Sequence, residues 1–473
     1  MEAHVTCSPQ MNDTPEESKP LKIAIVGGGP AGFFCAEALF RREPAARVDM
    51  YEALPVPFGL VRYGVAPDHP EIKRVTKAFE RTAQRPGFSF LGNVEIGRDL
   101  TVGELQSAYN AVVFAYGAPR HRNLEIPGED LPGSFGADEI VGWYNGSPQH
   151  AGLEIDLSGK SVAIIGNGNV ALDLARILAK NEKELASTDI TSHALDALKT
   201  SEIEQIHVIG RRGPVQASFT SGELHELDHL AGFMPVTNAE DFDLDPASEA
   251  ELNEIDVQRR RAYEVLHEFS APRAQTKRGF IRFHFCKSPL EILGTSAVTV
   301  LRLHSNELIA EENYVKAVPS DLPPSDLQAD IVIRSIGYVA DSLEGMPFDE
   351  RSGTAQNVDG RIQRDGMSVP GLYAAGWIQY GAKGLIGSSK KAAAQTAAML
   401  LSDRDTLPVC EDDGPETIRK HLSKCGIQSV SWTDWKTIDA VECSAGGERG
   451  KPREKFTSVD AMLSRLTLQK LEQ

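Results

Sequence analysis

The chain contains 473 residues, of which 41% are apolar and 25% charged, and its net charge is −18. This length exceeds what one hydrophobic core ordinarily serves, so we expect two or three domains. The acidic balance argues against nucleic acid as a general partner. The sequence has no apolar run of about 18 residues, so no membrane span is expected.

The first twenty residues are rich in acidic side chains and have neither an apolar core nor the basic excess of a transit peptide. We therefore expect residues 1–20 to form a disordered tail. Six cysteines are scattered without a CxxC pair, which indicates free thiols in a reducing compartment and no metal or iron–sulfur site in this chain. They are Cys7, Cys35, Cys286, Cys410, Cys425 and Cys443.

Two units of strand, turn, helix and strand follow in chain order. The first covers residues 21–26, 27–32, 33–41 and 48–52. The second covers residues 161–165, 166–171, 172–180 and 205–209. Such units bind dinucleotides at the turn, so two of them about 140 residues apart predict two nucleotide sites.

The sequence between and after these units predicts an insertion. Residues 111–118 and 331–339 favour strands that end in a glycine-containing turn, where the chain could cross between domains. We therefore predict an α/β protein with two Rossmann-like, three-layer dinucleotide-binding domains, one discontinuous (21–118 and 340–473) and one inserted into it (119–339). Surface loops are expected at 240–254 and 319–325, and peripheral helices after residue 407, apart from a polar loop at 446–455.

The first turn has the spacing GxGxxG, with Gly27, Gly29 and Gly32 between a strand and a helix. Glycine permits a tight turn and close approach to a pyrophosphate, and the helix start offers N–H groups to phosphates. Glu52 lies 20 residues beyond Gly32, at the end of the next strand. A carboxylate there accepts hydrogen bonds from a ribose diol and repels a 2′-phosphate, so FAD is the expected nucleotide.

The second turn has the spacing GxGxxA, and its following strand ends in Arg211 and Arg212, where an acidic residue would select NAD. Guanidinium groups bind phosphate through paired, charge-assisted hydrogen bonds, so NADP(H) is expected; a solvated basic turn is the alternative. The discontinuous domain is then the FAD-binding domain and the insert the NADP-binding domain. This pair of cofactors predicts hydride transfer from nicotinamide C4 to flavin N5, promoted by alignment rather than by a protein nucleophile.

Several longer strings resemble one family, the adrenodoxin-reductase type of ferredoxin–NADP(+) reductase. They are VGGGPAGFF (26–34), FGLVRYGVAPDHPEIK (58–73), GNGNVALDLARIL (166–178), GRRGPVQASFTSGEL (210–224), RSIGY (334–338), GWIQYGAKGLIG (376–387) and GKPREK (450–455). The resemblance covers nearly the whole chain from about residue 21, and VGWYN at 141–145 is more similar to the bacterial branch than to the mitochondrial one. It implies an FAD enzyme that passes electrons between NADPH and an acidic, ferredoxin-type iron–sulfur protein, and it implies a monomer. With the acidic start, it favours a bacterial cytoplasm, with the mitochondrial matrix as the alternative.

The resemblance also implies site residues. Positions that line FAD in the family correspond to Gly29, Ala31, Glu52, Gly59, Leu60, Val94, Trp377, Gly384, Leu385 and Ile386. Positions that contact NADP correspond to Asn167, Gly168, Asn169, Val170, Arg211, Arg212 and Glu223. His69 and Asp173 correspond to polar residues near the flavin and the nicotinamide approach.

Catalytic roles are predicted for His69, Glu223 and Asp173, each with a structural alternative. His69 could tune flavin protonation near neutral pH or form a structural hydrogen bond. Glu223 could orient the nicotinamide carboxamide or relay a proton, or be a charge at a helix start. Asp173 could cap or pack its helix instead of serving the cofactor. One departure from the family is Ala382-Lys383, where Pro-Thr is usual; the loss of proline relaxes that turn and Lys383 adds a cation.

A basic run in the insert is a candidate docking patch for an acidic carrier, by electrostatic steering; an ordinary solvated helix face is the alternative. It comprises Arg259, Arg260, Arg261, Arg273, Lys277, Arg278 and Arg282. Three other functions remain open. A disulfide reductase would need paired cysteines beside the flavin, whereas Cys35 stands alone in its helix. A flavoprotein monooxygenase and a non-catalytic FAD- and NADP-binding redox sensor would use the same two nucleotide sites.

Overall fold

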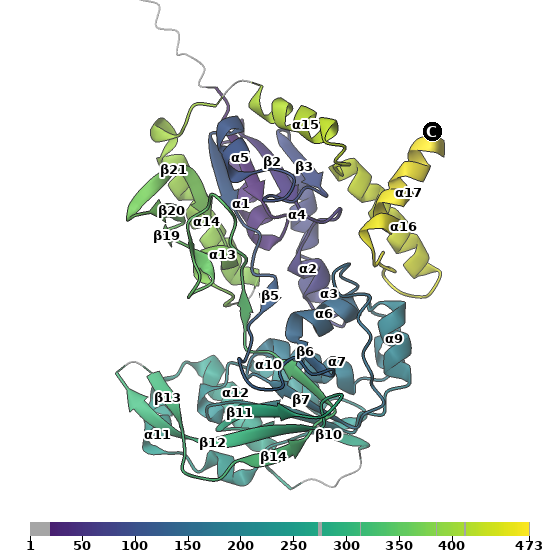
Figure 1. Ribbon diagram of the computed structural model, residues 1–473, viewed down its shortest axis with the longest axis vertical. Coiled ribbons are helices and arrows are strands. Elements are labelled where there is room, and N and C mark those ends of the chain that lie inside the picture. The colour runs from purple at the N-terminus through teal and green to yellow at the C-terminus, as the bar shows by residue number, and fades with distance from the viewer. Residues whose placement is uncertain (1–18, 273–276, 313, 385, 411–412, 473) are drawn as a thin grey trace, which may run out of the picture.

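The computed structural model describes residues 19–472 except 273–276, 313, 385 and 411–412, so most of the predicted N-terminal tail lies outside the described residues. Two β-sheets, one above the other in Figure 1, each form the centre of a layered α/β unit. The chain enters the upper unit, passes through the lower unit and returns to the upper one.

The upper sheet has seven strands in the order β19-β20-β21-β4-β1-β2-β3. Its parallel part comprises β1 (Lys22–Val26), β2 (Arg47–Glu52), β3 (Phe88–Gly92), β4 (Ala111–Phe114) and β21 (Met367–Ala374). Strands β19 (Asn357–Val358) and β20 (Arg361–Arg364) add antiparallel to one edge. Along β1, Ile23 and Ile25 pack into one apolar core and Ala24 and Val26 into another, so both faces of the sheet are covered.

Helices cover both faces of the upper sheet. On one face lie α1 (Pro30–Arg42), α4 (Thr76–Ala83) and α14 (Ile386–Ser402), and on the other α5 (Val102–Ala108) and α15 (Gly414–Lys424). Short elements between these are α2 (Leu60–Tyr63), α3 (Pro70–Lys73), β17 (Phe348–Asp349), β18 (Thr354–Ala355), α13 (Trp377–Tyr380) and a 3-10 turn (Arg404–Thr406).

The lower sheet has six parallel strands in the order β6-β15-β7-β8-β10-β9. They are β6 (Ser134–Gly136), β15 (Ile331–Arg334), β7 (Ser161–Ile165), β8 (Gln205–Ile209), β10 (Gly279–His284) and β9 (Phe233–Val236). One face packs on helices: α6 (Ala137–Asn145), α7 (Asn169–Ala179), α8 (Glu182–Leu185), α9 (Ser192–Lys199), α10 (Ser221–Asp228) and α12 (Val257–Glu268).

A second, antiparallel sheet covers the other face of the lower sheet, through Ile292, Leu301 and Leu303 packed against Ala163 and Ile165. Its strands are β11 (Lys287–Leu293), β12 (Val300–Glu311), β13 (Tyr314–Pro319) and β14 (Ser325–Gln328). No motif in the sequence predicted this layer. Because the inserted unit has a sheet where a helix layer was expected, its helices are concentrated on one face.

Two short strands join the units where the chain crosses between them: β5 (Arg120–His121) pairs antiparallel with β16 (Tyr338–Val339). The lower sheet is formed by chain between β4 and β21 of the upper sheet, so the predicted α/β class with an inserted second Rossmann-like unit is confirmed. The boundaries at residues 118 and 340 stay predictions.

The prediction of a surface loop over residues 240–254 is wrong, because this stretch forms a 3-10 turn (Ala239–Phe242) and the helix α11 (Pro246–Glu254). The Asp245 side chain accepts hydrogen bonds from the backbone N–H groups of Ala247 and Ser248, and Pro246 occupies the first helical position. Both are strong helix-start signals, so local capping overrides the high charge of the segment.

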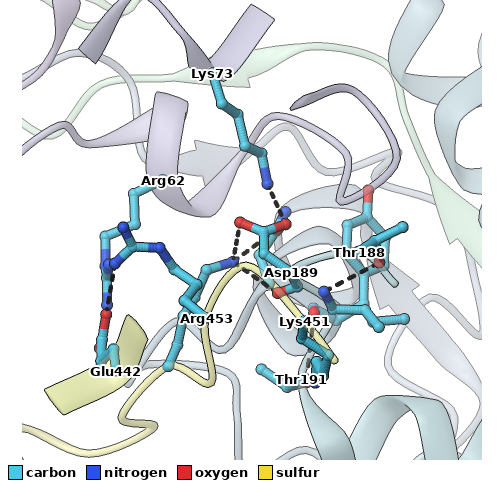
Figure 2. A network of polar contacts seen from close by, with 12 residues as sticks. Arg62, Lys73, Thr188, Asp189, Thr191, Glu442, Lys451 and Arg453 are labelled. Atoms are coloured by element: carbon cyan, nitrogen blue, oxygen red, sulfur yellow. Dashed lines mark hydrogen bonds and ion pairs between the residues drawn. The ribbon is translucent and has the colours of Figure 1, made fainter. Parts of the chain in front are cut away.

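The expectation that the C-terminal helices are peripheral is also wrong. Helices α16 (Trp432–Gly447) and α17 (Val459–Glu472) contribute Trp435, Ile438 and Met462 to a buried core, and Trp435 packs edge-on against Phe58 at 5.9 Å between ring centroids. Buried ion pairs add to this packing (Figure 2). Glu442 is fully buried and accepts hydrogen bonds from Arg62 and Arg453.

The polar loop after α16 reaches the inserted unit. Lys455 is buried, and its Nζ lies 3.1 Å from Asp189 Oδ2, while Lys73 Nζ lies 2.6 Å from Asp189 Oδ1. Asp189 belongs to the inserted unit, Lys73 ends α3, and Lys455 follows α16 (Figure 2 shows Lys73 and Asp189). One carboxylate therefore connects three segments that are distant in sequence.

We expect Glu442→Ala to lower the free energy of unfolding by about 3–5 kcal/mol, because the substitution leaves the buried Arg62 guanidinium without its carboxylate partner and removes one of the two carboxylates that Arg453 contacts. Urea unfolding followed by circular dichroism measures the change. The matched control is Glu95→Ala, which removes an exposed pair with Arg98 and should cost under about 1 kcal/mol. Equal losses in the two variants would contradict the central position of Glu442.

Candidate functional site

The first glycine turn connects β1 to α1. Gly29 precedes α1 without a side-chain cap, so the N–H groups of the first helical turn point toward the space above the turn. Gly27 has a φ of +113°, and a Cβ there would lie 2.6 Å from the backbone of Ala115. Only glycine fits this position. Ala31, in the first turn of α1, is buried.

Glu52 ends β2 and fixes this turn. Its Oε2 accepts a hydrogen bond from Gly28 N at 2.8 Å, and its Oε1 accepts one from Leu54 N at 3.1 Å. Burial raises the pKa of Glu52 and these backbone bonds oppose the rise. Each carboxylate oxygen accepts a further bond, so the group can serve both the turn and a diol.

Other predicted residues of the first site gather around the same turn. Phe58 N donates to Gly28 O at 2.7 Å, which brings Gly59 against Gly29 and places Leu60 at the start of α2. Val94 is buried and its N–H donates to Glu52 O at 3.0 Å. Residues from three separate segments therefore surround the start of α1.

The segment 376–386 lies over the start of α1. A Cβ on Gly376 would lie 2.5 Å from Ala31 Cβ, and the adjacent Trp377 stacks on Tyr338 with ring centroids 5.9 Å apart. Gly384 has a φ of +79° and α14 begins at Ile386; Leu385 lies outside the described residues. At the departure from the family, Ala382 packs partly buried against a core and Lys383 is exposed.

The second glycine turn connects β7 to α7, and Gly168 precedes α7 without a side-chain cap. The loop after β8 lies on this turn, because Ser218 N donates to Asn167 O and Thr220 N donates to Asn169 Oδ1, both at 2.9 Å. Within the described chain, the buried Asn167 Oδ1 has no hydrogen-bond partner, so a ligand donor would satisfy it. Val170, in the first turn of α7, is half-buried.

Arg211 and Arg212 follow β8; Arg211 is exposed and Arg212 half-buried. A cavity of about 970 Å³ begins at Arg212, Ser218 and Thr220, next to the second glycine turn. It extends to α11, the start of α12 and the end of the β12–β13 hairpin. The two predicted nucleotide turns therefore differ: Glu52 adjoins the first, and two arginines and a large cavity adjoin the second.

His69, Asp173 and Glu223 come together at the junction of the two units. His69 Nδ1 lies 3.9 Å from Asp173 Oδ1, and His69 Nε2 lies 3.8 Å from Glu223 Oε2. His69 Nε2 also bonds Glu226 Oε2 at 3.1 Å. Asp173 lies on α7 and Glu223 on α10, whereas His69 belongs to the segment between α2 and α3.

Arg176 organises this cluster. It is fully buried, and its guanidinium donates to Asp68 at 2.8 Å, Asp173 at 2.7 Å and Glu223 at 2.9 Å. Asp68 also accepts from Lys180 at 2.6 Å. The atoms of His69, Asp173 and Glu223 are close enough to hold a metal ion, but Arg176 already compensates both carboxylates and would repel a second cation.

The cluster shifts the pKa values of its titratable groups. Burial raises the pKa values of Asp173 and Glu223, against the opposing charge of Arg176. Burial alone would lower the pKa of His69, but the hydrogen bond to Glu226 and the charges of Asp173 and Glu223 raise it. Perturbed groups of this kind concentrate at functional sites.

The predicted basic run does not form one continuous surface. Arg259 bonds Glu251 Oε1 at 2.7 Å and Val215 O at 3.0 Å, Arg260 bonds Leu252 O, and Arg261 is exposed. Lys277 donates to carbonyls of Asp228 and Leu230, Arg278 lies over the Phe233 ring, and Arg282 donates to Asn238; Arg273 lies outside the described residues.

Comparison with known proteins agrees with this geometry. Residues 21–211 match the pyridine nucleotide-disulphide oxidoreductase family. The chain is 42% identical to human mitochondrial NADPH:adrenodoxin oxidoreductase over 94% of its length and 92% of that protein. It is 40% identical to the NADPH-ferredoxin reductase FprA of Mycobacterium tuberculosis, over 94% of this chain and 99% of that protein. The chain belongs to the adrenodoxin reductase and FprA family.

A solved structure of Mycobacterium tuberculosis FprA in complex with NADPH superposes on this adrenodoxin-reductase-type chain with a TM-score of 0.90, at 39% identity, covering 95% of this chain and 100% of FprA. The recognition of the family from its motifs is thereby confirmed. The identities of 42% and 40% do not favour the mitochondrial or the bacterial branch. Within the described ranges, none of the helices combines the length and apolar character that a bilayer span requires.

Sequence reasoning missed Arg176, Asp68 and Glu226 in this family member. Signals for them were present: Asp68 precedes His69 directly, and Arg176 follows Asp173 by three residues, which places both on one face of a helix. Their convergence could not be seen because α7, α10 and the loop before α3 are brought together only by the packing of the two units.

We expect the stability difference between the wild-type protein and His69→Gln to depend on pH. Because the folded state raises the pKa of His69, its stabilising contribution is complete below the ordinary value of 6.5 and is lost as the pH rises through the raised pKa. The wild type should therefore lose its advantage over the variant on going from pH 6 to pH 8.5. Urea midpoints without added nucleotide measure this, and parallel curves for the two proteins would contradict it.

Proposed function

We propose that this protein is an FAD-dependent NADPH–ferredoxin reductase, with FAD at the first glycine turn and NADP(H) at the second. The observation that carries the proposal is the contrast between two uncapped helix starts, one beside Glu52 and the other beside Arg211 and Arg212. An acidic strand end favours an unphosphorylated ribose, and an arginine pair favours a 2′-phosphate. The names of the relatives given above support the same reaction.

The residues around the first turn fit FAD. The start of α1 offers N–H groups to the diphosphate, Glu52 accepts from the ribose, and the close approach of Gly59 to Gly29 leaves space that a side chain would fill. When bound, FAD supplies the conversion between a two-electron hydride donor and one-electron carriers. We assign Trp377, Gly384, Leu385 and Ile386, with the start of α14, to the flavin ring, and Leu60 and Val94 to its edges.

At the second turn, the start of α7 would hold the diphosphate of NADP(H), and the unsatisfied Asn167 Oδ1 would accept a hydrogen bond from a ribose hydroxyl of the nucleotide. Gly168, Asn169 and Val170 complete this turn. Arg212 borders the cavity that would receive the adenosine half, and Arg211 would reach the phosphate from the surface.

The roles we propose for His69, Asp173 and Glu223 follow from their place at the junction. Glu223 and Asp173, whose pKa values burial raises, would orient the nicotinamide carboxamide and hold a proton when needed. His69, whose pKa the hydrogen bond to Glu226 and the nearby carboxylates raise, would hold a proton that balances the charge of a reduced flavin. Arg176 contacts four carboxylates of the cluster, those of Asp68, Asp173, Glu223 and Glu226, and is a positioning residue.

The alternative functions have less support. A disulfide reductase needs two neighbouring cysteines, but the five cysteines in the described chain are free, and burial raises the pKa of Cys35 to about 12, which makes its thiol inert. The electron acceptor that the reduced protein uses distinguishes the reductase from the monooxygenase and from the non-catalytic sensor. Mixing with NADPH without oxygen should bleach the flavin, and cytochrome c should be reduced only when ferredoxin is added. Rapid, ferredoxin-independent oxygen consumption would favour the monooxygenase.

Nucleotide preference tests the two-site assignment directly. Stopped-flow reduction of bound flavin should be much more efficient with NADPH than with NADH. In Arg212→Ala, the apparent KM for NADPH should rise roughly 10- to 100-fold, as expected for a lost charge-assisted hydrogen bond, while the KM for NADH stays within about twofold. A colourless protein that does not take up FAD, or equal rates with both nucleotides in the wild type, would refute the proposal.

We also propose that the carrier docks near the exposed Arg261 on α12 by electrostatic steering, so binding weakens with salt. Arg261→Glu should raise the KM for ferredoxin several-fold at low salt and leave ferricyanide reduction intact. The matched charge reversal is Arg302→Glu, on the antiparallel sheet at the opposite face of the inserted unit. Equal effects of the two charge reversals on the KM for ferredoxin, or loss of ferricyanide reduction, would refute the proposed docking site on α12. The compartment and a monomeric state stay predictions.

A further inference from the structure

The cavity of about 970 Å³ in the inserted unit extends well beyond the residues that the glycine-turn motif identifies. Its lining includes Arg212, Ser218 and Thr220, and Thr220 is hydrogen-bonded to Asn169 of the second glycine turn. The same lining includes residues of α11 and, at the start of α12, Gln258 and Arg259. Arg259 is close enough to Arg212 for its charge to lower the pKa of Arg212, so an anion bound at Arg212 would also lie near Arg259.

Arg259 lines this cavity with a side chain that is 38% exposed. One of its terminal nitrogens donates to Val215 O at 3.0 Å, in the same loop as Arg212, and to Glu251 Oε1 at 2.7 Å. Glu251 in turn accepts from Gln216 Nε2 at 2.9 Å. A guanidinium has five N–H groups, so Arg259 retains donors for a bound anion while it is anchored on both sides.

Arg212 and Arg259 share an excess of positive charge. Burial lowers the pKa of Arg212, and the charges of Arg211 and Arg259 lower it further, whereas only Glu251 opposes them. The other acidic residues of the lining are exposed: Glu254, Asp256, Glu311 and Glu312. Of these, Asp256 caps α12 and Glu311 pairs with Lys316. Glu251 is therefore the half-buried carboxylate that lies near these arginines. A bound anion would offset the positive charge that Glu251 leaves uncompensated.

We propose that Arg259 is a further specificity residue for NADP(H): together with Arg212 it binds the 2′-phosphate, and Glu251 holds it in position before the nucleotide arrives. This inference rests on the proposed binding of NADP(H) at the second turn. A 2′-phosphate carries close to two negative charges, which suits two guanidinium groups. NAD(H) lacks this phosphate and leaves Arg259 paired with Glu251 alone.

The proposal divides the basic sequence at the start of α12 between two functions. Successive helical residues are separated by about 100°, so Arg259 and Arg261 point in different directions. Arg259 faces the cavity and Arg261 faces solvent. Arg259 is thereby assigned to the nucleotide, and Arg261 to the carrier protein.

The test measures binding of 2′,5′-ADP and 5′-AMP to the FAD-loaded protein by calorimetry. In Arg259→Ala, we expect the affinity for 2′,5′-ADP to fall roughly 10- to 100-fold and that for 5′-AMP to change less than about twofold. Arg259→Lys, which keeps the charge but not the fork, should lie between. Arg261→Ala is the matched neighbour and should leave the affinity for both nucleotides unchanged.

Three other results would contradict the role of Arg259 or the binding of NADP(H) at this turn. If Arg212→Ala loses 2′,5′-ADP binding and Arg259→Ala does not, the inference about Arg259 is wrong and the proposed function stands. If Arg259→Ala weakens both nucleotides equally, Arg259 only supports the loop at Val215, and the inference also fails. If the wild type binds 5′-AMP as tightly as 2′,5′-ADP, the assignment of NADP(H) to this turn is itself wrong.

Discussion

The buried guanidinium of Arg176 is the interaction on which the arrangement of the two units depends. A fully buried cation is tolerated only where carboxylates surround it, and here they come from both units: Asp68 from the upper unit, and Asp173 and Glu223 from the lower one. Removal of any partner would leave charge uncompensated in a region of low dielectric. The pairing therefore fixes α7, whose start forms the second glycine turn, against the segment that carries His69.

A second set of ion pairs, which involves the C-terminal part of the chain, also fixes the two units relative to each other. Burial lowers the pKa of Lys455 to about 7, against the opposing charge of Asp189, and Lys73 approaches the same carboxylate. Asp189 thus connects the inserted unit with α3 and with the loop after α16. With Glu442 between Arg62 and Arg453, the C-terminal helices close the interface between the units. Two nucleotide turns on separate sheets are held in a defined relation by charge as well as by apolar packing.

The protein is acidic overall, with a net charge of −18, yet three arginines gather in one part of the inserted unit. Arg211, Arg212 and Arg259 lie at or near one cavity. In the lining of that cavity Glu251 forms an ion pair with Arg259, which lowers the repulsion among the arginines before an anion binds. In general, a neighbouring counterion reduces the repulsion within a cluster of like charges in the folded protein. A bound ligand of opposite charge then compensates the charge that is left.

The sequence by itself determined the features that depend on local physical rules. The two glycine turns, the strands β7 and β8, Glu52 and Arg211–Arg212 follow from residue types at short, fixed spacings. In α11 the acidic composition favours a loop, but the local capping signals of Asp245 and Pro246 prevail. Tertiary packing alone sets the antiparallel sheet over the lower unit, the burial of the C-terminal helices, the Arg176 cluster and the contact of Arg259 with Val215. These features join residues up to 380 positions apart, and such contacts arise from packing between elements that no local pattern encodes.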